Sequence, residues 1–392
     1  MKKFFIFAAA ALVALTACNK VETDNAPAQK VTFQAANYVP QTKAVSVLSD
    51  FTSFKSKAYL HAEGIDLNAD GSVKTNSFQN FFGTAGETIS PDSTTDPTEW
   101  APSHTYYWPK GTKSFVNFIG WYGTTGSAAS DPDISYAYDN TASAYKATLT
   151  WDFSNETVGA AGANLLYADM AWRFKANNDP ATYGMNHVTE GVPMLFHHAL
   201  AQINVKAYAT GDPALTAGTN KVTESGVADW VITLENVKIT PIHRAGTLTL
   251  TNTDPGTKQT QAWTGDWAGT DTAGDLTASN FTVQKVTSAT AEDLIAATCV
   301  LPQTIAADDV VLSFNMRIVT TYLGTNAGQT NTELIPVSIK LNNDFGTTAW
   351  EKNHKYTYYV KIVPSQNKVL FDPALDEAWV NVPASDTTEK EI

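Results

Sequence analysis

Residues 66–71, Asp-Leu-Asn-Ala-Asp-Gly, have the alternating oxygen-bearing side chains and the glycine turn of the first half of a calcium-binding EF-hand loop. The second half does not fit, because the twelfth position is Ser77, where such a loop needs a bidentate glutamate, and no helical pattern flanks it. An Asp-Gly hairpin turn is therefore the preferred interpretation of this segment.

His197 and His198 form a second group that could hold a metal ion. Neighbouring residues of a strand point to opposite faces of a sheet, so the two imidazoles cannot share one ion. We therefore expect a structural role for each histidine.

The sequence contains none of the common catalytic motifs: His-Glu-x-x-His, Gly-x-Ser-x-Gly or a phosphate-binding glycine loop. The acidic residues are spread through loops, and their spacing does not distinguish a glycosidase pair from a solvated surface. We therefore expect no catalytic residues, no bound metal and no cofactor, and we interpret the protein as not being an enzyme.

The composition of the chain excludes several classes of protein. Of 392 residues, 43% are hydrophobic and 17% are charged, which excludes a disordered chain and a charge-rich coiled coil. The net charge of −13 has the wrong sign for neutralising phosphates, so nucleic acid is excluded as a partner. The two cysteines, Cys18 and Cys299, are too far apart and too different in context to form a disulfide framework.

Residues 1–17 have the features of a signal peptide: two lysines at the start, an apolar stretch too short to span a bilayer, and small residues before Cys18. Small residues directly before a cysteine at the end of a signal sequence resemble the bacterial lipobox, in which the cysteine is acylated. Cys18 is then a lipid anchor, and residues 19–30 are a polar tether. The alternative is an ordinary signal peptide cut after Ala17, with an incidental cysteine.

Beyond the signal peptide the apolar residues repeat with a period of two. In residues 145–153 every odd position is apolar and every even one is polar, which indicates a strand with one face in a core. The same alternation recurs in residues 203–207, 230–234, 310–318, 335–341 and 356–362, with turn-forming residues between the runs. Helical periodicity is missing, so we expect only short helices in connections and an all-β fold of antiparallel sandwich strands.

The length fits two tandem β-sandwiches better than one. The Gly-, Asn- and Asp-rich run 175–191 is the best candidate for a boundary. We therefore expect an N-terminal sandwich over residues 44–191 and a C-terminal sandwich over residues 192–392.

Several motifs that follow the lipobox occur in an order similar to that of the fimbrillin family of pilus subunits from Gram-negative anaerobes. They are Thr42-Lys43-Ala44, Tyr106-Tyr107-Trp108-Pro109, residues 115–122 (FVNFIGWY), residues 164–168 (NLLYA), residues 195–203 (LFHHALAQI), residues 300–304 (VLPQT) and residues 350–358 (WEKNHKYTY). Each motif is weak alone, but the ordered set runs through nearly the whole chain.

The resemblance implies two transthyretin-like β-sandwiches, exported as an outer-membrane lipoprotein and matured at the cell surface by a trypsin-like protease. Maturation in this family removes the first strand, and the subunits then polymerise into a fimbrium that serves adhesion. The implied partners are other fimbrial subunits, membrane lipid through Cys18, the protease, and a host ligand or glycan.

Residues 18–43 would then comprise the lipidated tether and the removable strand. Val31, Phe33 and Ala35 alternate along this strand and can lie in a groove of the precursor. Loss of the strand would expose an apolar slot and an unpaired edge, which is a template for an incoming strand.

The resemblance places processing between Lys43 and Ala44. The family's usual residue before the cut is Arg, so an Arg-specific protease would leave the strand in place. This departure suits an anchor subunit or a subunit that is matured by a protease that accepts lysine. The alternative for Lys43 is a plain solvated loop lysine.

A subunit that accepts a strand must also supply one, and the chain continues well beyond the last core strand at residues 356–363. Ala378, Val380 and Val382 share one face of a short apolar stretch and are the donor candidate. Asp372-Pro373 would interrupt a ladder and allow this tail to swing. The alternative is that the tail completes its own sheet.

A second function, that of a monomeric surface lipoprotein that binds glycans, stays open, because exposed aromatic rings can stack on sugars. Most of the tryptophans lie in or beside strand patterns, where burial is expected. Trp263 and Trp267, in a Gly-, Thr- and Asp-rich stretch, are the better candidates for an exposed pair.

Overall fold

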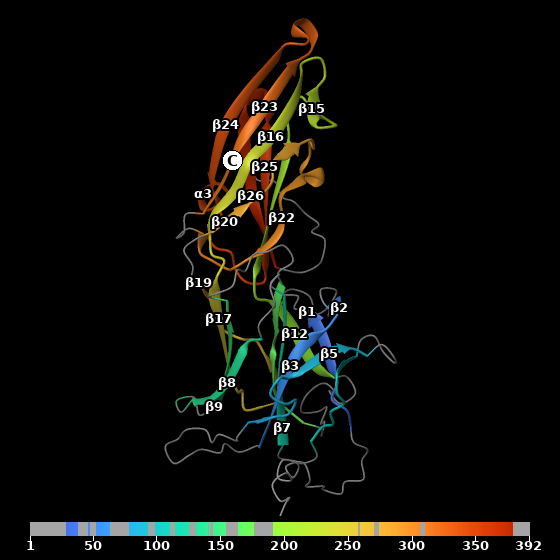
Figure 1. The fold of residues 1–392 in the computed structure, drawn as a ribbon, viewed down its shortest axis with the longest axis vertical. Coiled ribbons are helices and arrows are strands. Elements are labelled where there is room, and N and C mark those ends of the chain that lie inside the picture. The colour runs from blue at the N-terminus through green and yellow to red at the C-terminus, as the bar shows by residue number, and fades with distance from the viewer. Residues whose placement is uncertain are drawn as a thin grey trace, which may run out of the picture.

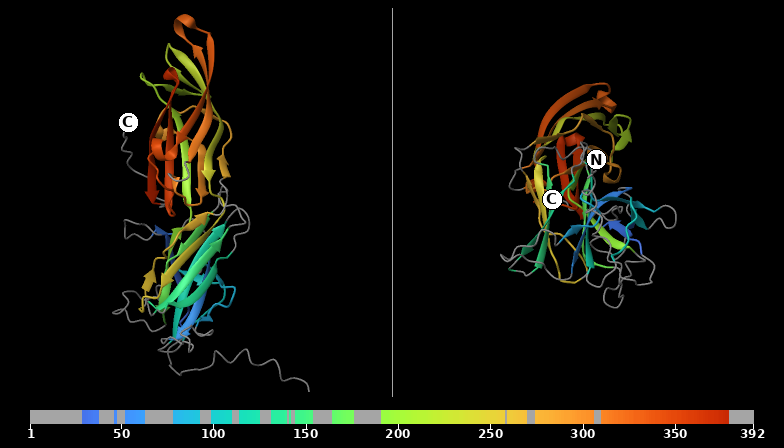
Figure 2. Two further views of the ribbon diagram at one scale, coloured as in Figure 1. Left: turned by 90° about the vertical axis from the view of Figure 1, so that its left-hand side faces the viewer. Right: turned by 60° about the horizontal axis from the view of Figure 1, so that its bottom comes forward.

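A computed structural model shows an elongated molecule with two β-rich halves stacked end to end (Figures 1 and 2). It describes residues 29–37, 46–47, 52–62, 78–92, 99–109, 114–124, 131–139, 141, 144–153, 164–175, 191–257, 259–269, 274–305 and 310–378. The predicted all-β fold is confirmed, since strands make up most of both halves.

The N-terminal half is built around a sheet that closes on itself. Seven strands follow one another in the order β7-β10-β12-β1-β6-β5-β3, and β3 pairs again with β7, so they form a ring. Their bounds are β1 (Phe33–Asn37), β3 (Phe54–Ala62), β5 (Glu87–Pro91), β6 (Trp100–Pro102), β7 (Ser114–Thr124), β10 (Asn164–Ala168) and β12 (Val192–His198). Four short strands are added to the ring: β2 (Ser46–Val47), β4 (Gln79–Asn80), β11 (Met170–Phe174) and β18 (Gln259–Gln261).

A second sheet contributes to the N-terminal half. It comprises β8 (Asp133–Asp139), β9 (Ala144–Asp152), β17 (Gly246–Thr253) and β19 (Trp267–Gly269). One hydrophobic core joins Val31, Phe33 and other ring residues, and another joins ring residues to side chains of the second sheet. The alternation predicted for residues 145–153 is confirmed, because the odd positions of β9 are buried and the even ones are more exposed.

The strands β7 and β10 separate these two cores. Leu166 and Ala168 pack in the first core, whereas Leu165 and Tyr167 pack in the second. A strand that is buried on both faces needs a continuous apolar run. This requirement explains why the sequence motif Asn164–Ala168 is almost uniformly apolar.

The C-terminal half is a sandwich of two sheets around a third core. One sheet has the order β22-β13-β25-β26, formed by β13 (Ala201–Ala209), β22 (Glu292–Val300), β25 (His354–Val363) and β26 (Lys368–Ala378). The other comprises β14 (Thr216–Gly218), β15 (Lys221–Glu224), β16 (Ala228–Ile242), β20 (Gly274–Thr277), β21 (Phe281–Val283), β23 (Val311–Tyr322) and β24 (Thr330–Lys340).

Helical turns are confined to connections, as predicted. Within the described residues they are η1 (Ser288–Thr290), η2 (Gly324–Asn326), α3 (Leu341–Asp344) and η3 (Pro364–Gln366). None of these helices has the length or the apolar character needed to cross a membrane.

The sheets do not follow the division expected at residues 191 and 192. The strand β12 belongs to the ring, and the chain passes into the C-terminal sandwich only at Ala199-Leu200, before β13. Residues 246–269 then return to the N-terminal half as β17, β18 and β19. Strand alternation predicts where strands lie but not which sheet they join, so this return could not be seen in the sequence.

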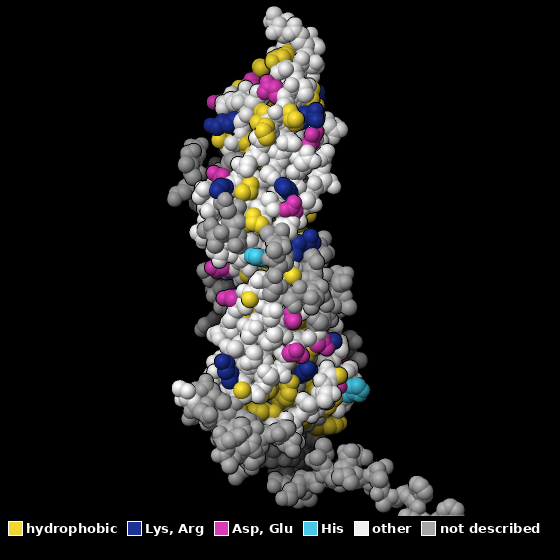
Figure 3. Space-filling view, turned by 60° about the vertical axis from the view of Figure 1, so that its left-hand side comes forward, with side chains coloured by type: hydrophobic (Ala, Val, Ile, Leu, Met, Phe, Trp, Pro, Cys, Tyr) yellow, Lys and Arg dark blue, Asp and Glu magenta, His cyan; other side chains and the backbone are white. Residues whose placement is uncertain are grey.

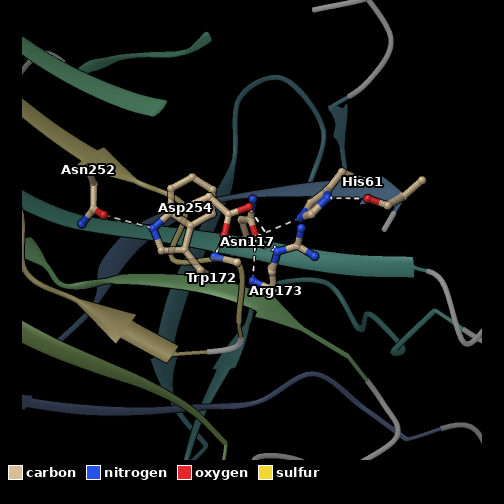
Figure 4. A network of polar contacts seen from close by, with 8 residues as sticks. His61, Asn117, Trp172, Arg173, Asn252 and Asp254 are labelled. Atoms are coloured by element: carbon tan, nitrogen blue, oxygen red, sulfur yellow. Dashed lines mark hydrogen bonds and ion pairs between the residues drawn. The ribbon is translucent and has the colours of Figure 1, made fainter. Parts of the chain in front are cut away.

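A cluster of polar side chains joins the ring strands and β11 to the end of β17 (Figure 4). The Oδ1 atom of Asn117 accepts a hydrogen bond from the backbone N–H of Arg173 at 2.8 Å and lies 3.2 Å from Nε2 of His61. The Nε atom of Arg173 lies 3.1 Å from Asp254, and both side chains are largely buried. Burial holds the pKa of His61 below its ordinary value.

The same region contains a second polar link. The Nε1 atom of Trp172 donates to Oδ1 of Asn252 at 3.1 Å. The Nδ2 atom of Asn252 donates to the backbone carbonyls of Gln261 and Ala262. The bond from Trp172 joins the returning segment to β11, and the bonds from Asn252 hold two parts of that segment together.

We predict that Asp254→Ala lowers the free energy of unfolding by about 3 kcal/mol or more, because it leaves the buried Arg173 charge without its partner. Urea denaturation measures the loss. The matched control is Arg317→Ala, which breaks the more exposed pair between Arg317 and Glu235 and should scarcely move the midpoint. Equal losses in the two variants would contradict the assignment.

Candidate functional site

The strand β1 lies between β12 and β6, and we call this position in the sheet the β1 berth. Residues Phe33–Asn37 pair in parallel with residues Val192–Phe196, and Phe33 also pairs with Trp100 on β6. At its far end β1 pairs with β2. Because β1 is the one described link between β12 and β6, it is the strand that closes the ring.

The side chain of Phe33 lies at the centre of the ring's core and is fully buried. Its ring makes edge-to-face contacts with Phe118, Phe54 and Phe82, at centroid distances of 5.4, 6.0 and 6.2 Å. Val31 is also buried, and Ala35 is half-buried against the same core. The structure thus places these side chains in the core, while the removal of their strand stays a prediction.

A short segment that contains the Tyr106-Tyr107-Trp108 motif holds the start of β1 in place. The N–H of Val31 donates to the carbonyl of Tyr106, and the N–H of Trp108 donates to the carbonyl of Gln29, each at 2.9 Å. We call residues 103–108 the latch. Trp108 is buried and packs edge-to-face on Phe118 at 5.7 Å.

The carboxylate of Glu87 holds the latch. It accepts hydrogen bonds from the hydroxyls of Ser103 and Tyr106, the latter at 2.7 Å, and lies 3.0 Å from Nδ1 of His104. Burial alone would raise the pKa of Glu87, but these hydrogen bonds outweigh it and hold the pKa below its ordinary value. The sequence gives no sign of this group beyond the tyrosine-tryptophan motif itself.

The predicted processing and lipidation residues, Cys18, Lys43 and Ala44, lie outside the described residues, as do residues 66–71 and Ser77. Val380 and Val382 of the donor candidate also lie outside them. Cleavage, acylation and donation at these positions therefore stay predictions.

The strand β26, which ends at Ala378, pairs with β25 from Val363↔Lys368 to His354↔Ala378. Asp372-Pro373 does not end this ladder as expected, because a shift of register near Thr357 and Tyr359 accommodates it. The edge position of β26 also allows a proline there. Residues 368–378 thus complete their own sheet.

The two histidines have separate environments, as predicted for neighbours on a strand. His197 contacts Asp169 through Nε2 at 2.7 Å and stacks on Tyr167. His198 is buried with its Nδ1 atom 3.0 Å from Asn164, and burial lowers its pKa to about 3. Within the described residues no group of His, Cys, Asp and Glu side chains could hold a metal ion.

The prediction of an exposed tryptophan pair is wrong. Trp263 is buried and its indole N–H donates to the carbonyl of Ala168 at 2.9 Å. Trp267 is half-buried and donates to the carbonyl of Ala199 at 2.7 Å. Both indole N–H groups donate to carbonyls that are distant in the sequence. The polar residues next to each tryptophan in the sequence therefore did not indicate exposure of its side chain.

Charged side chains of both signs are mixed on one face of the described part of the molecule. On the face in Figure 3, acidic and basic side chains are interspersed along the length of the molecule, and apolar side chains are scattered between them and gathered near its lower end.

We predict that Glu87→Gln lowers the free energy of unfolding at pH 7 by about 1 kcal/mol, because charge-assisted hydrogen bonds become neutral ones. The depressed pKa of Glu87 stabilises the fold above the unfolded pKa, and this contribution is lost as the pH falls. The stability of the variant should therefore decline less in acid than that of the parent chain. Urea denaturation at neutral and acidic pH measures both effects, with Glu224→Gln on β15 as the control. Parallel pH curves for Glu87→Gln and the parent chain would refute this role of Glu87.

Comparison with known protein families identifies one family whose model matches this sequence. The family model described as fimbrillin-like matches residues 65–374, which include most of both halves. No curated protein matches the chain.

Solved structures of similar proteins are remote in sequence. A fimbrial protein from Bacteroides vulgatus is 17% identical, with coverage of 90% of this chain and 100% of that one and a TM-score of 0.47. A candidate cell adhesion protein from Bacteroides uniformis is 16% identical, with coverage of 90% and 98% and a TM-score of 0.39. The fimbrial anchor protein Mfa2 from Porphyromonas gingivalis is 9% identical, with coverage of 90% and 98% and a TM-score of 0.27.

The family assignment rests on the sequence match, which extends over well more than half of the chain. This match agrees with the order of the sequence motifs, which run from Tyr106 and Tyr107 in the latch to residues 350–358. The chain therefore belongs to the fimbrillin-like family.

Proposed function

We propose that this chain is a structural, non-enzymatic subunit of a surface fimbrium that serves cell adhesion, and that it polymerises by exchange of the strand in the β1 berth. The observation that carries this proposal is the closed ring, in which one N-terminal strand closes the sheet and fills its core. That strand ends at Asn37, and Lys43 follows it closely in the sequence. A cut after Lys43 would leave β1 held by non-covalent contacts alone.

Loss of β1 would leave the ring incomplete in two ways. The core would lose Val31 and Phe33, each of which contributes about 1.5–3 kcal/mol of burial. The facing edges of β12 and β6 would lose their hydrogen-bonding partner. Unpaired edges beside an apolar slot favour the addition of a strand from another chain, and a second subunit can supply it.

The N-terminal sequence supports export as a lipoprotein. In this proposal Cys18 anchors the precursor in the outer membrane, and a trypsin-like protease that accepts lysine releases the subunit between Lys43 and Ala44. A chain that escapes cleavage would keep its first strand and its lipid, and would serve as an anchor. The alternative function, a monomeric glycan-binding lipoprotein, predicts a single band on an unboiled gel where a fimbrial subunit gives a ladder.

We predict that cleavage between Lys43 and Ala44 allows β1 to leave and polymers to form. Phe33→Ala should destabilise the uncut chain by about 3–5 kcal/mol and should hasten the loss of the strand after cleavage. Gln34→Ala is the matched control, because Gln34 lies on the same strand with an exposed side chain. Limited digestion with a lysine-specific protease, N-terminal sequencing and an unboiled gel follow these steps. If the parent chain, Phe33→Ala and Gln34→Ala all stay monomeric after the cut, strand exchange is refuted.

We predict that truncation after Ala378 gives a folded monomer that cannot extend a polymer, because it keeps β26 but lacks residues 379–392 with Val380 and Val382. Truncation after Ser365 is the contrasting variant, since it removes β26 and should lower the melting temperature of the C-terminal sandwich. Circular dichroism and the unboiled gel separate the two effects. A polymer ladder from the chain that ends at Ala378 would show that the donor lies elsewhere.

A further inference from the structure

A cavity of about 500 Å³ lies where the two halves of the chain meet. Asp266 and Trp267 line it from the start of β19, and residues 302–304 and 349–352 line it from the C-terminal half. Its volume falls within the range of about 300–1,000 Å³ that is typical of small-molecule sites. None of the proposed polymerisation steps uses this cavity.

Its walls are fixed by contacts that do not require a ligand. Gln303 and Trp350 form a two-way backbone bridge, with N–H to carbonyl distances of 3.0 and 2.8 Å. The indole N–H of Trp350 donates to the hydroxyl of Tyr358 at 2.7 Å. The Nζ atom of Lys352 donates to the carbonyl of Gly265 at 2.6 Å and pairs with Asp266. A cavity with preorganised walls loses little entropy when it binds a ligand.

The lining combines an aromatic ring with accessible carboxylates. Trp267 is a lining residue whose half-buried indole packs on Phe153, and its N–H is already bonded to Ala199, so the indole contributes apolar surface rather than a free hydrogen-bond donor. The carboxylates of Asp266 and Glu351 are on side chains that are 76% and 65% exposed. Such carboxylates accept strong hydrogen bonds from hydroxyl groups, while an aromatic face packs against C–H groups.

We propose that this cavity binds a pyranose sugar that is neutral or carries an amino group, with its C–H face on Trp267 and its hydroxyls on Asp266 and Glu351. The lining has two carboxylates and one ammonium group, that of Lys352, with the imidazole of His354 3.8 Å from Glu351 outside the lining, and this balance disfavours an acidic sugar. The proposal does not depend on polymerisation, because one chain supplies every wall of the cavity.

The test uses fluorine NMR of the full chain labelled with 5-fluorotryptophan, in which Trp267→Phe identifies the signal of residue 267. The probes are methyl β-D-glucopyranoside, D-glucosamine and, as an acidic sugar, N-acetylneuraminic acid. The Trp267 signal should shift saturably with the first two probes, with dissociation constants in the millimolar range, and at least tenfold more weakly with the third.

Binding should weaken about tenfold in Glu351→Gln, because a charge-assisted hydrogen bond is lost, and should be unchanged in the control Glu224→Gln. Glu351 is exposed, so this variant should keep the melting temperature of the parent chain. A Trp267 signal that no probe moves would overturn the proposal. Equal binding of the acidic sugar, or full binding by Glu351→Gln, would also overturn it.

Discussion

The packing of Phe33 inside the ring is the interaction on which the N-terminal half depends. One side chain from a five-residue strand contacts three other phenylalanines, and its backbone joins β12 to β6. Core filling and sheet closure therefore rest on the same short segment. Removal of this segment would therefore leave both an apolar slot in the core and a gap in the sheet.

Contacts outside β1 hold the strands and the latch that surround it. β7 and β10 are buried on both faces, and the Arg173–Asp254 pair joins the ring to the segment that returns from the C-terminal half. The latch covers the start of β1 through hydrogen bonds to Gln29 and Val31, and Glu87 holds the latch. The Arg173–Asp254 pair and the bonds from Ser103 and Tyr106 to Glu87 involve no residue of β1, so this part of the frame is held independently of that strand.

Much of the fold could be predicted from the sequence, because local alternation reports burial directly. β9, β23 and β25 follow the predicted pattern, and so do the inward positions of Val31 and Phe33. Pairings between distant segments could not be predicted: the return of β17 to the N-terminal half, and the carbonyls that bind the indoles of Trp263 and Trp267. Glu87 and Ser103 are sixteen positions apart, and no sequence pattern connects them, so their contact could not be predicted either.

The continuous path of the backbone through Ala199-Leu200 has a mechanical consequence. β12 ends in one half and β13 begins in the other, and both of the residues between them are buried in the N-terminal core. A pull along the molecule would thus act parallel to these two strands. Their ladders would be loaded in shear, with all their hydrogen bonds strained together rather than opened one after another. This arrangement would oppose extension along the length of the molecule.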